Sequence, residues 1–189
     1  ACSKAPQIAT KDGPDAKKES TKAAVAVAAR TPYFEMYKAA RAWATDLLAL
    51  TVKSGELPGF KNEGGKAGVW VAVFVSPSRK EARTFTYAVA NGDGLLKGIN
   101  VSDKQTWTGA TTASKAFVNA EFLVDSDAAF EVAQQKAAAW LKTHPNRKYS
   151  MTLGSTARFP APVWYIMWGT SKDGYAAYVN AATGKLVTR

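Results

Sequence analysis

The chain has 189 residues, a formal net charge of +10 at pH 7 and a sequence pI of about 9.7. With 47% hydrophobic residues it can bury a core, either as one two-lobed domain or as two small domains. A single cysteine excludes an intramolecular disulfide and a thiolate metal site, and no apolar run has transmembrane length. The excess of lysine and arginine favours acidic partners: anionic lipid, nucleic acid, acidic polysaccharide or an acidic protein surface.

Residues 1–21 predict a flexible tether. This stretch is polar, rich in lysine and interrupted by proline and glycine, so it has too little apolar surface to offset the entropy of ordering its backbone. Cys2 follows the small residue Ala1, and this start resembles the cleavage region of bacterial lipoproteins, in which the cysteine becomes lipidated. The presence of Ala1 counts against such processing, so a lipid anchor at Cys2 and an incidental free thiol both stay open.

Residues 22–100 predict a first unit of strand, helix and antiparallel meander. The segment KAAVAVAAR reads as a strand. The following stretch reads as a helix with Thr31 as N-cap, Pro32 at the first helical position and Gly55 as the stop. A meander from Gly68 to Gly98 then contains the turn sequence NGDG.

Residues 101–114 predict a linker loop, because Ser, Thr, Gly and Asp dominate the sequence. Trp107 is the exception within it. Either its side chain covers the edge of a core, or it is an exposed aromatic that contacts a partner.

Residues 115–189 predict a second unit of the same kind. KAFVNAEFLVD reads as its strand, and the following helix has Ser126 as N-cap and Pro145 beyond its end. In the closing meander, Trp164 matches Trp70 and Tyr178 matches Tyr87 of the first unit. The fold class is therefore α+β, with two tandem units whose helices each pack across a sheet. We expect the two units to pack against each other, because the connection between them is only moderately long. The alternative is that their sheets join edge to edge, which would cover exposed edge strands.

The motif VDSDAAFEVAQQKAAAW, followed by PVWYIMW and GYAAYVNAATGKLV, resembles the PepSY family. The resemblance covers Leu123 to Val187, and residues 68–98 fit it more loosely. Family members often carry Asp where this chain has Asn180. The resemblance implies a cystatin-like α+β module and an exported bacterial protein, some relatives being linked to the inhibition or regulation of peptidases.

Candidate binding residues cluster after the second helix, where the sequence HPNRKYS places Arg147, Lys148 and Tyr149 together. These cations either complement the negative end of the helix dipole or form an anion-contacting patch. Arg158 and Trp107 complete the set of candidate partner-binding residues.

The sequence predicts no enzyme, no metal site and no cofactor. The single histidine, His144, has no nucleophile beside it, and Asp125 and Asp127 are explained as charges at a helix N-terminus. Nucleic acid is not expected, because no RNP or zinc-finger pattern occurs, and the free face of VWYIMW is explained equally well as covered by the sheet of the partner unit.

These observations predict a non-enzymatic binding or structural protein, exported to the periplasm, outer surface or extracellular space. It would dock on a protein partner, an acidic surface or a membrane-associated assembly. Two alternatives stay open: a peptidase inhibitor or regulator, as the PepSY resemblance implies, and a self-assembling extracellular subunit that forms homo-oligomers.

Overall fold

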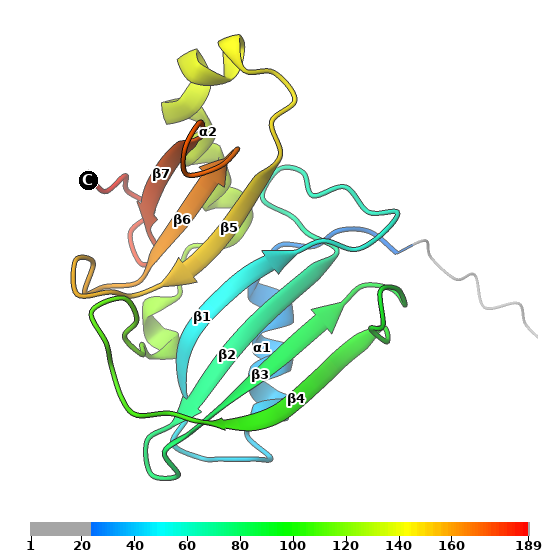
Figure 1. Cartoon of the computed structure of the whole chain (residues 1–189), viewed down its shortest axis with the longest axis vertical. Coiled ribbons are helices and arrows are strands. Elements are labelled where there is room, and N and C mark those ends of the chain that lie inside the picture. The colour runs from blue at the N-terminus through cyan, green and yellow to red at the C-terminus, as the bar shows by residue number, and fades with distance from the viewer. Residues whose placement is uncertain (1–23, 189) are drawn as a thin grey trace, which may run out of the picture.

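The computed structural model describes residues 24–188, which fold into one antiparallel sheet and two α-helices (Figure 1). The helices are α1 (Arg30–Ala40) and α2 (Ser126–Thr143). The strands are β1 (Leu48–Gly55), β2 (Val69–Ser76), β3 (Glu81–Ala88), β4 (Gly98–Thr106), β5 (Tyr149–Gly154), β6 (Val163–Trp168) and β7 (Tyr175–Asn180). They form a seven-stranded sheet in the order β4-β3-β2-β1-β5-β6-β7, which confirms the α+β class.

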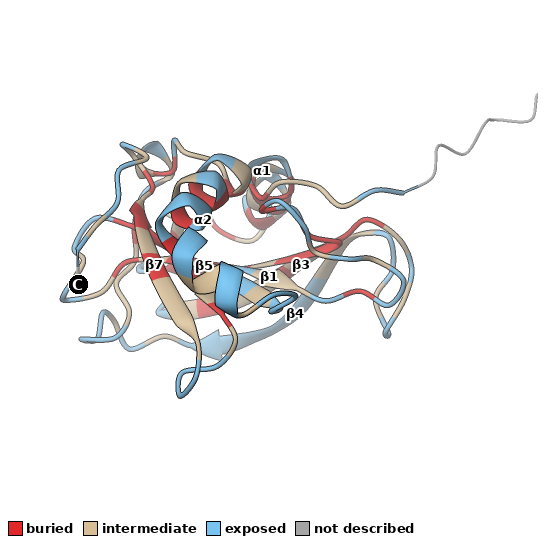
Figure 2. Cartoon of the chain, turned by 90° about the horizontal axis from the view of Figure 1, so that it is seen from above, coloured by how far each residue is buried: buried red, intermediate tan, exposed pale blue. Residues whose placement is uncertain are grey.

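Both helices lie on the same face of this sheet (Figure 2). Helix α1 contacts β2, β3 and β4, and α2 contacts β6 and β7. Side chains alternate between the two faces of each strand, so Trp164, Ile166 and Trp168 of β6 are buried beneath the helices. We call the opposite face, over which no helix lies in residues 24–188, the open face.

The two halves of the sheet join edge to edge between β1 and β5. Lys53 pairs with Thr152, and Val52 pairs with Leu153. Beyond this ladder, the Ser54 hydroxyl accepts a hydrogen bond from the Met151 N–H at 3.0 Å. The expectation that the two units pack against each other is therefore wrong. Their sheets join edge to edge, which pairs two strand edges that would otherwise be exposed.

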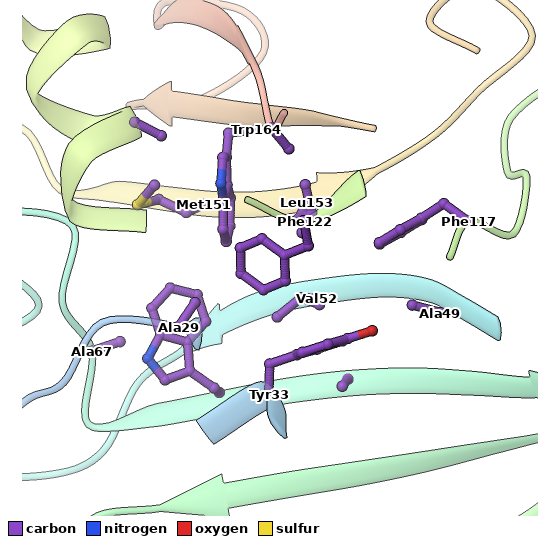
Figure 3. Close-up of a cluster of buried hydrophobic side chains, with 14 of the residues drawn as sticks. Ala29, Tyr33, Ala49, Val52, Ala67, Phe117, Phe122, Met151, Leu153 and Trp164 are labelled. Carbon is purple, nitrogen blue, oxygen red and sulfur yellow. The ribbon is translucent and has the colours of Figure 1, made fainter. Parts of the chain in front are cut away.

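The core between the sheet and the helices is aromatic (Figure 3). Tyr33 and Phe122 meet edge to face with ring centroids 5.1 Å apart, and Phe122 meets Trp164 at 5.7 Å. The Tyr33 hydroxyl donates a hydrogen bond to Asn119, and burial raises the pKa of Tyr33. Side chains from both halves thus form one continuous core.

The N-termini of the two helices meet at Asp125 and Ser126. The Asp125 carboxylate accepts hydrogen bonds from the Ser126 N–H at 2.7 Å and from the Arg30 N–H at 2.9 Å. The Ser126 hydroxyl accepts from the Ala29 N–H at 2.9 Å. Asp125, and not Ser126, is therefore the N-cap of α2, because the buried Ser126 hydroxyl serves the other helix.

The first helix was expected to reach Gly55, and this is wrong. Helix α1 begins at Arg30, with Ala29 as its N-cap in place of Thr31, and ends at Ala40, while the stretch 48–55 forms β1. Backbone pairing with β2 on one edge and β5 on the other outweighs the local helical pattern of this stretch. The strand expected in KAAVAVAAR is also wrong, since its described part makes only a single bridge, from Val27 to Ala67.

Two further expectations are corrected in the middle of the chain. The predicted linker 101–114 is a loop only after residue 106, because the preceding residues belong to β4. KAFVNAEFLVD forms no strand; it makes isolated bridges at Lys115 and Phe117 and then a 3-10 turn, Asn119–Glu121. The predicted tether 1–21, including Cys2, lies outside the described residues.

The closing turn forms as expected. Gly184 has φ +70°, and the Asn180 side chain accepts hydrogen bonds from the N–H groups of Ala182 and Thr183 at 2.9 Å each. The expected match of Tyr178 with Tyr87 is wrong by one position. Tyr87 pairs with Trp70 on the helix side, whereas Tyr178 pairs with Tyr165 on the open face.

Candidate functional site

A groove of about 1100 Å³ opens at the end of the sheet where β1 ends and β5 begins. One wall is the β1–β2 loop, residues 56–64, and the other comprises the C-terminal part of α2 and the segment that follows it. We call this the terminal groove. It brings together three of the five candidate partner-binding residues: Arg147, Lys148 and Tyr149.

Tyr149 forms much of the floor of the terminal groove. Its ring lies 4.5 Å from that of Phe130 and 6.4 Å from that of Trp168, measured between centroids. The Tyr149 hydroxyl accepts a hydrogen bond from the Gly65 N–H at 3.0 Å, which ties the floor to the loop wall. Burial raises the pKa of Tyr149 to about 12, so the phenol is neutral at physiological pH.

The rim of the groove carries charges of both signs in exposed ion pairs. Lys148 lies 3.5 Å from Glu56, and Lys61 lies 3.5 Å from Glu63. Arg147 lies 3.2 Å from Asp173, which a Thr170 hydroxyl also contacts. Because each rim cation lies beside a carboxylate, the rim presents alternating charges and no concentrated positive field.

The loop wall is held against α2 by close backbone contact. Gly65 has φ +74°, and a Cβ placed there would lie 2.5 Å from the Ser126 carbonyl oxygen. Asn62 donates a hydrogen bond to the Gly55 carbonyl at 2.9 Å, but its own side-chain oxygen is buried without a hydrogen-bond partner. The loop is thus fixed at Gly65 and carries an unsatisfied acceptor near its middle.

The other two candidate residues lie at the opposite end of the sheet. Trp107 directly follows β4, is half-buried, and donates its backbone N–H to the Lys80 carbonyl at 2.9 Å. Arg158 is exposed in the β5–β6 connection, with its guanidinium carbon 5.4 Å from the ring centroid of Phe159. The structure therefore does not assemble the five candidates into one site.

Sequence reasoning missed the loop wall of the terminal groove, including Phe60, and the buried floor residues Phe130 and Trp168. Phe130 belongs to the apolar stripe of α2, so its pattern indicates a core position only. No local pattern connects residues 56–64 with residues 144–149, because only the β1–β5 pairing brings them together.

A second concentration of aromatic side chains lies on the open face of β6 and β7. Tyr165 and Tyr178 are direct cross-strand partners with ring centroids 5.1 Å apart, and Phe159 lies 5.0 Å from Tyr178. All three side chains are half-buried. Arg158 stands at the end of this row.

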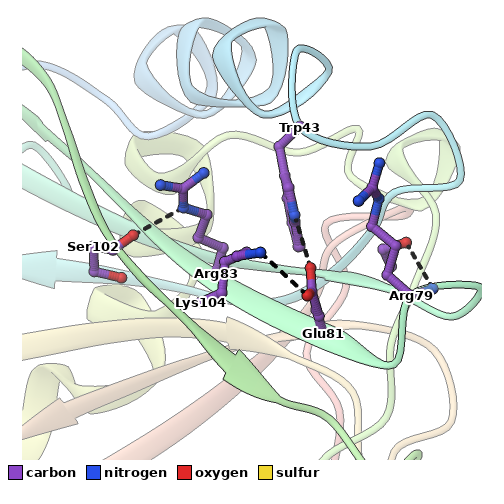
Figure 4. Close-up of polar contacts among 7 residues, drawn as sticks. Trp43, Arg79, Glu81, Arg83, Ser102 and Lys104 are labelled. Carbon is purple, nitrogen blue, oxygen red and sulfur yellow. Dashed lines mark hydrogen bonds and ion pairs between the residues drawn. The ribbon is translucent and has the colours of Figure 1, made fainter.

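The outer edge at β4 has polar side chains that disturb regular pairing (Figure 4). A register shift between Arg83 and Phe85 lets the Ser102 hydroxyl accept from the Thr84 N–H at 3.2 Å. Nearby, Glu81 accepts a hydrogen bond from the Trp43 indole at 3.1 Å and lies 3.4 Å from Lys104. Bulges and charged side chains of this kind limit pairing with another strand.

His144 stacks on Trp140 with ring centroids 4.2 Å apart, and its Nδ1 lies 3.0 Å from the Trp140 carbonyl oxygen. Within residues 24–188, no group of three or more His, Cys, Asp or Glu side chains is placed to hold a metal ion. No helix in this part of the chain is both long and apolar enough to cross a membrane.

Comparison with known proteins gives little further guidance. No protein-family model and no curated protein matches the chain. A crystal structure of a protein described as a "putative lipoprotein" from Clostridium difficile 630 is similar, at a TM-score of 0.45 and 11% identity over 89% of this chain and 94% of that one. A similarity this low carries no argument about function.

Proposed function

We propose that this chain is a non-enzymatic docking protein that holds an extended segment of another protein in the terminal groove. One observation carries the proposal: three candidate partner-binding residues, Arg147, Lys148 and Tyr149, face the β1–β2 loop across a wide groove. Grooves with an aromatic floor and a few polar groups on the rim are typical binding sites.

The chemistry of the groove favours a peptide over a uniformly acidic partner. Tyr149 and Phe60 offer partly exposed ring surface for apolar side chains, and rim ion pairs of both signs suit a segment of mixed charge. The Gly65 contact fixes the loop wall beforehand, which reduces the entropy lost on binding.

A displayed library of unstructured 12-residue peptides tests this function directly. We expect peptides enriched on the immobilised protein to lose about tenfold or more in affinity when Lys148→Glu and Arg147→Ala are combined. Arg158→Ala is the matched control for Arg147→Ala alone, because each replaces one exposed arginine by alanine and Arg158 lies at the other end of the sheet. A photo-crosslinking residue at Lys148 should label the peptide, and one at Trp107 should not.

Two outcomes contradict the proposal. One is a library that yields no enriched peptide, and the other is an affinity that the Arg147 and Lys148 changes leave equal to that of the Arg158→Ala control. Melting temperatures of all variants, measured alongside, separate loss of binding from loss of folding.

We infer further that the chain is built from two diverged PepSY-like units. The support is geometric: β1, β2 and β3 with α1 have counterparts in β5, β6 and β7 with α2. The indole N–H of Trp70 donates to the Val27 carbonyl at 2.8 Å just before α1, and that of Trp164 donates to the Val124 carbonyl at 2.9 Å just before α2.

Export and lipidation at Cys2 stay predictions, and intact mass of the native protein tests both. Added diacylglyceryl and acyl mass on a chain that begins at Cys2 would establish the anchor. An unmodified Ala1 start would contradict it. Inhibition of secreted peptidases, which the PepSY resemblance implies, gains no specific support from the terminal groove.

The two outer strands of the sheet, β4 and β7, both disfavour self-assembly by pairing between sheet edges. Strand β4 carries the bulge and charges described above. On β7, the C-terminal segment already pairs with the outer side, where the Val187 N–H donates to the Tyr178 carbonyl at 2.9 Å. Head-to-tail addition of sheets would require this segment to be displaced.

A further inference from the structure

The open face carries a row of side chains that runs across four neighbouring strands. Tyr178 of β7 pairs with Tyr165 of β6, Tyr165 pairs with Thr152 of β5, and Thr152 pairs with Lys53 of β1. Direct cross-strand partners project from the same face, so these four side chains form one line perpendicular to the strands. Phe159, from the β5–β6 connection, contacts the ring of Tyr178, and the guanidinium of Arg158 lies over the Phe159 ring.

This row lies on the face that the helices leave uncovered. From the sequence, such an aromatic face is explained as covered by the sheet of the partner unit. Because β1 and β5 join edge to edge instead, no sheet or helix within residues 24–188 lies over it. Lys53 is exposed, and the aromatic side chains are half-buried.

The charged side chains near this row on the open face are positive. Among strands β1 to β3 and β5 to β7 the only carboxylate is Glu81, and it faces the helix side, where Trp43 binds it. The row includes one cation, Lys53, and the guanidinium of Arg158 lies over the ring of Phe159, which contacts Tyr178. The face is therefore complementary to a ligand with flat apolar surfaces and scattered negative charges.

We propose that the open face binds an acidic polysaccharide laid across β7, β6, β5 and β1, with its sugar rings on Tyr178 and Tyr165 and its carboxylates beside Lys53 and Arg158. The apolar C–H face of a pyranose stacks on an aromatic ring. Strands are spaced about 4.8 Å apart, close to the length of one pyranose residue, so successive rings meet successive strands. The Thr152 hydroxyl lies in the same row and can hydrogen-bond a sugar hydroxyl.

Single-stranded nucleic acid also stacks on aromatic side chains, but it fits this face less well. Its phosphates require a groove lined by many cations along the backbone path. The row offers only Lys53 and Arg158. An acidic polysaccharide has one carboxylate every residue or two and many hydroxyls, so it needs fewer cations on the protein.

Affinity electrophoresis of the full chain in gels that contain polygalacturonate, hyaluronan or alginate tests the proposal. We expect at least one of these polymers to retard the wild type and neutral dextran to leave it unaffected. Tyr178→Ala and Lys53→Glu should each weaken the retardation by roughly tenfold or more, whereas Tyr178→Phe, which keeps the ring, should retain most of it.

Lys148→Glu is the control for net charge, because it makes the same change from lysine to glutamate in the terminal groove and leaves the open face intact. Lys53→Glu changes an exposed side chain, so it tests the site even if Tyr178→Ala unfolds the protein. The proposal is overturned if none of the three polymers retards the wild type, if Lys53→Glu and Lys148→Glu behave alike, or if an oligo-dT strand binds the open face more tightly than the polysaccharides.

Discussion

Trp70 and Trp164 meet edge to face in the centre of the molecule, with ring centroids 6.1 Å apart and ring planes at 70°. Both side chains are fully buried, and each comes from the strand next to the β1–β5 seam. Each indole also donates a hydrogen bond to the chain segment that leads into a helix. The pair thus links both halves of the sheet and both helix N-termini in one contact.

Replacing either tryptophan should therefore destabilise the whole fold. We expect Trp70→Phe and Trp164→Phe each to lower the free energy of unfolding by about 2–4 kcal/mol, because a backbone carbonyl loses its donor and a buried ring loses volume. The double variant should reveal a coupling of about 0.5–1.5 kcal/mol for the ring pair in urea titrations. Trp107→Phe, at a half-buried site, is the control; equal losses at all three positions would contradict the central role of the pair.

Ser126→Ala should weaken the joint between the helices. The Ser126 hydroxyl is buried and accepts from the Ala29 N–H, so its removal leaves a buried donor without a partner, at a cost of about 1–3 kcal/mol. Chemical denaturation measures the loss. Ser150→Ala, on an exposed position of β5, should change stability little, and a comparable loss there would point to a different cause.

Gly65→Ala should displace the loop wall of the terminal groove. The new methyl group would lie 2.5 Å from the Ser126 carbonyl oxygen and 2.6 Å from the Asp127 Cα, at a residue with φ +74°. Together the clash and the backbone strain should cost about 2–4 kcal/mol and weaken peptide binding.

Gly64→Ala is the matched control for Gly65→Ala. Gly64 also has positive φ, +56°, but nothing lies within 4 Å of its Cβ position, so only the backbone penalty of about 1 kcal/mol applies. Equal destabilisation by the two substitutions would show that the loop does not press on α2. Thermal unfolding of the pair, side by side, decides this.

The stability of the fold should depend on Asp46 at low pH. Hydrogen bonds from the Ser76 hydroxyl and the Ser78 N–H lower the pKa of Asp46 to about 2. A carboxyl group whose pKa is lower in the folded than in the unfolded chain stabilises the fold. This contribution is complete at a pH above the unfolded-state pKa, and it is lost as the pH falls towards the folded-state pKa. We expect the melting temperature of wild type to exceed that of Asp46→Asn at pH 7, and the gap to close between about pH 4 and pH 2. A gap that stays constant with pH would contradict this.

Local sequence patterns determined several elements of this protein. The apolar periodicity of α2 and its end before Pro145, the aromatic and β-branched runs of β2 and β6, and the glycine turn at Gly184 are short-range features, and each formed as expected. These features are enough to predict the α+β class, because in these segments local propensity and burial favour the same secondary structure.

Only the tertiary structure decided how these elements combine. The stretch that forms β1 has a helical pattern on its own but becomes a strand because β2 and β5 pair with both of its edges. That pairing places residues 56–64 beside residues 144–149 to form the terminal groove, and it leaves the open face without a second layer. Hydrogen bonds between strand edges join residues about a hundred positions apart, and no pattern within one segment encodes which edge meets which.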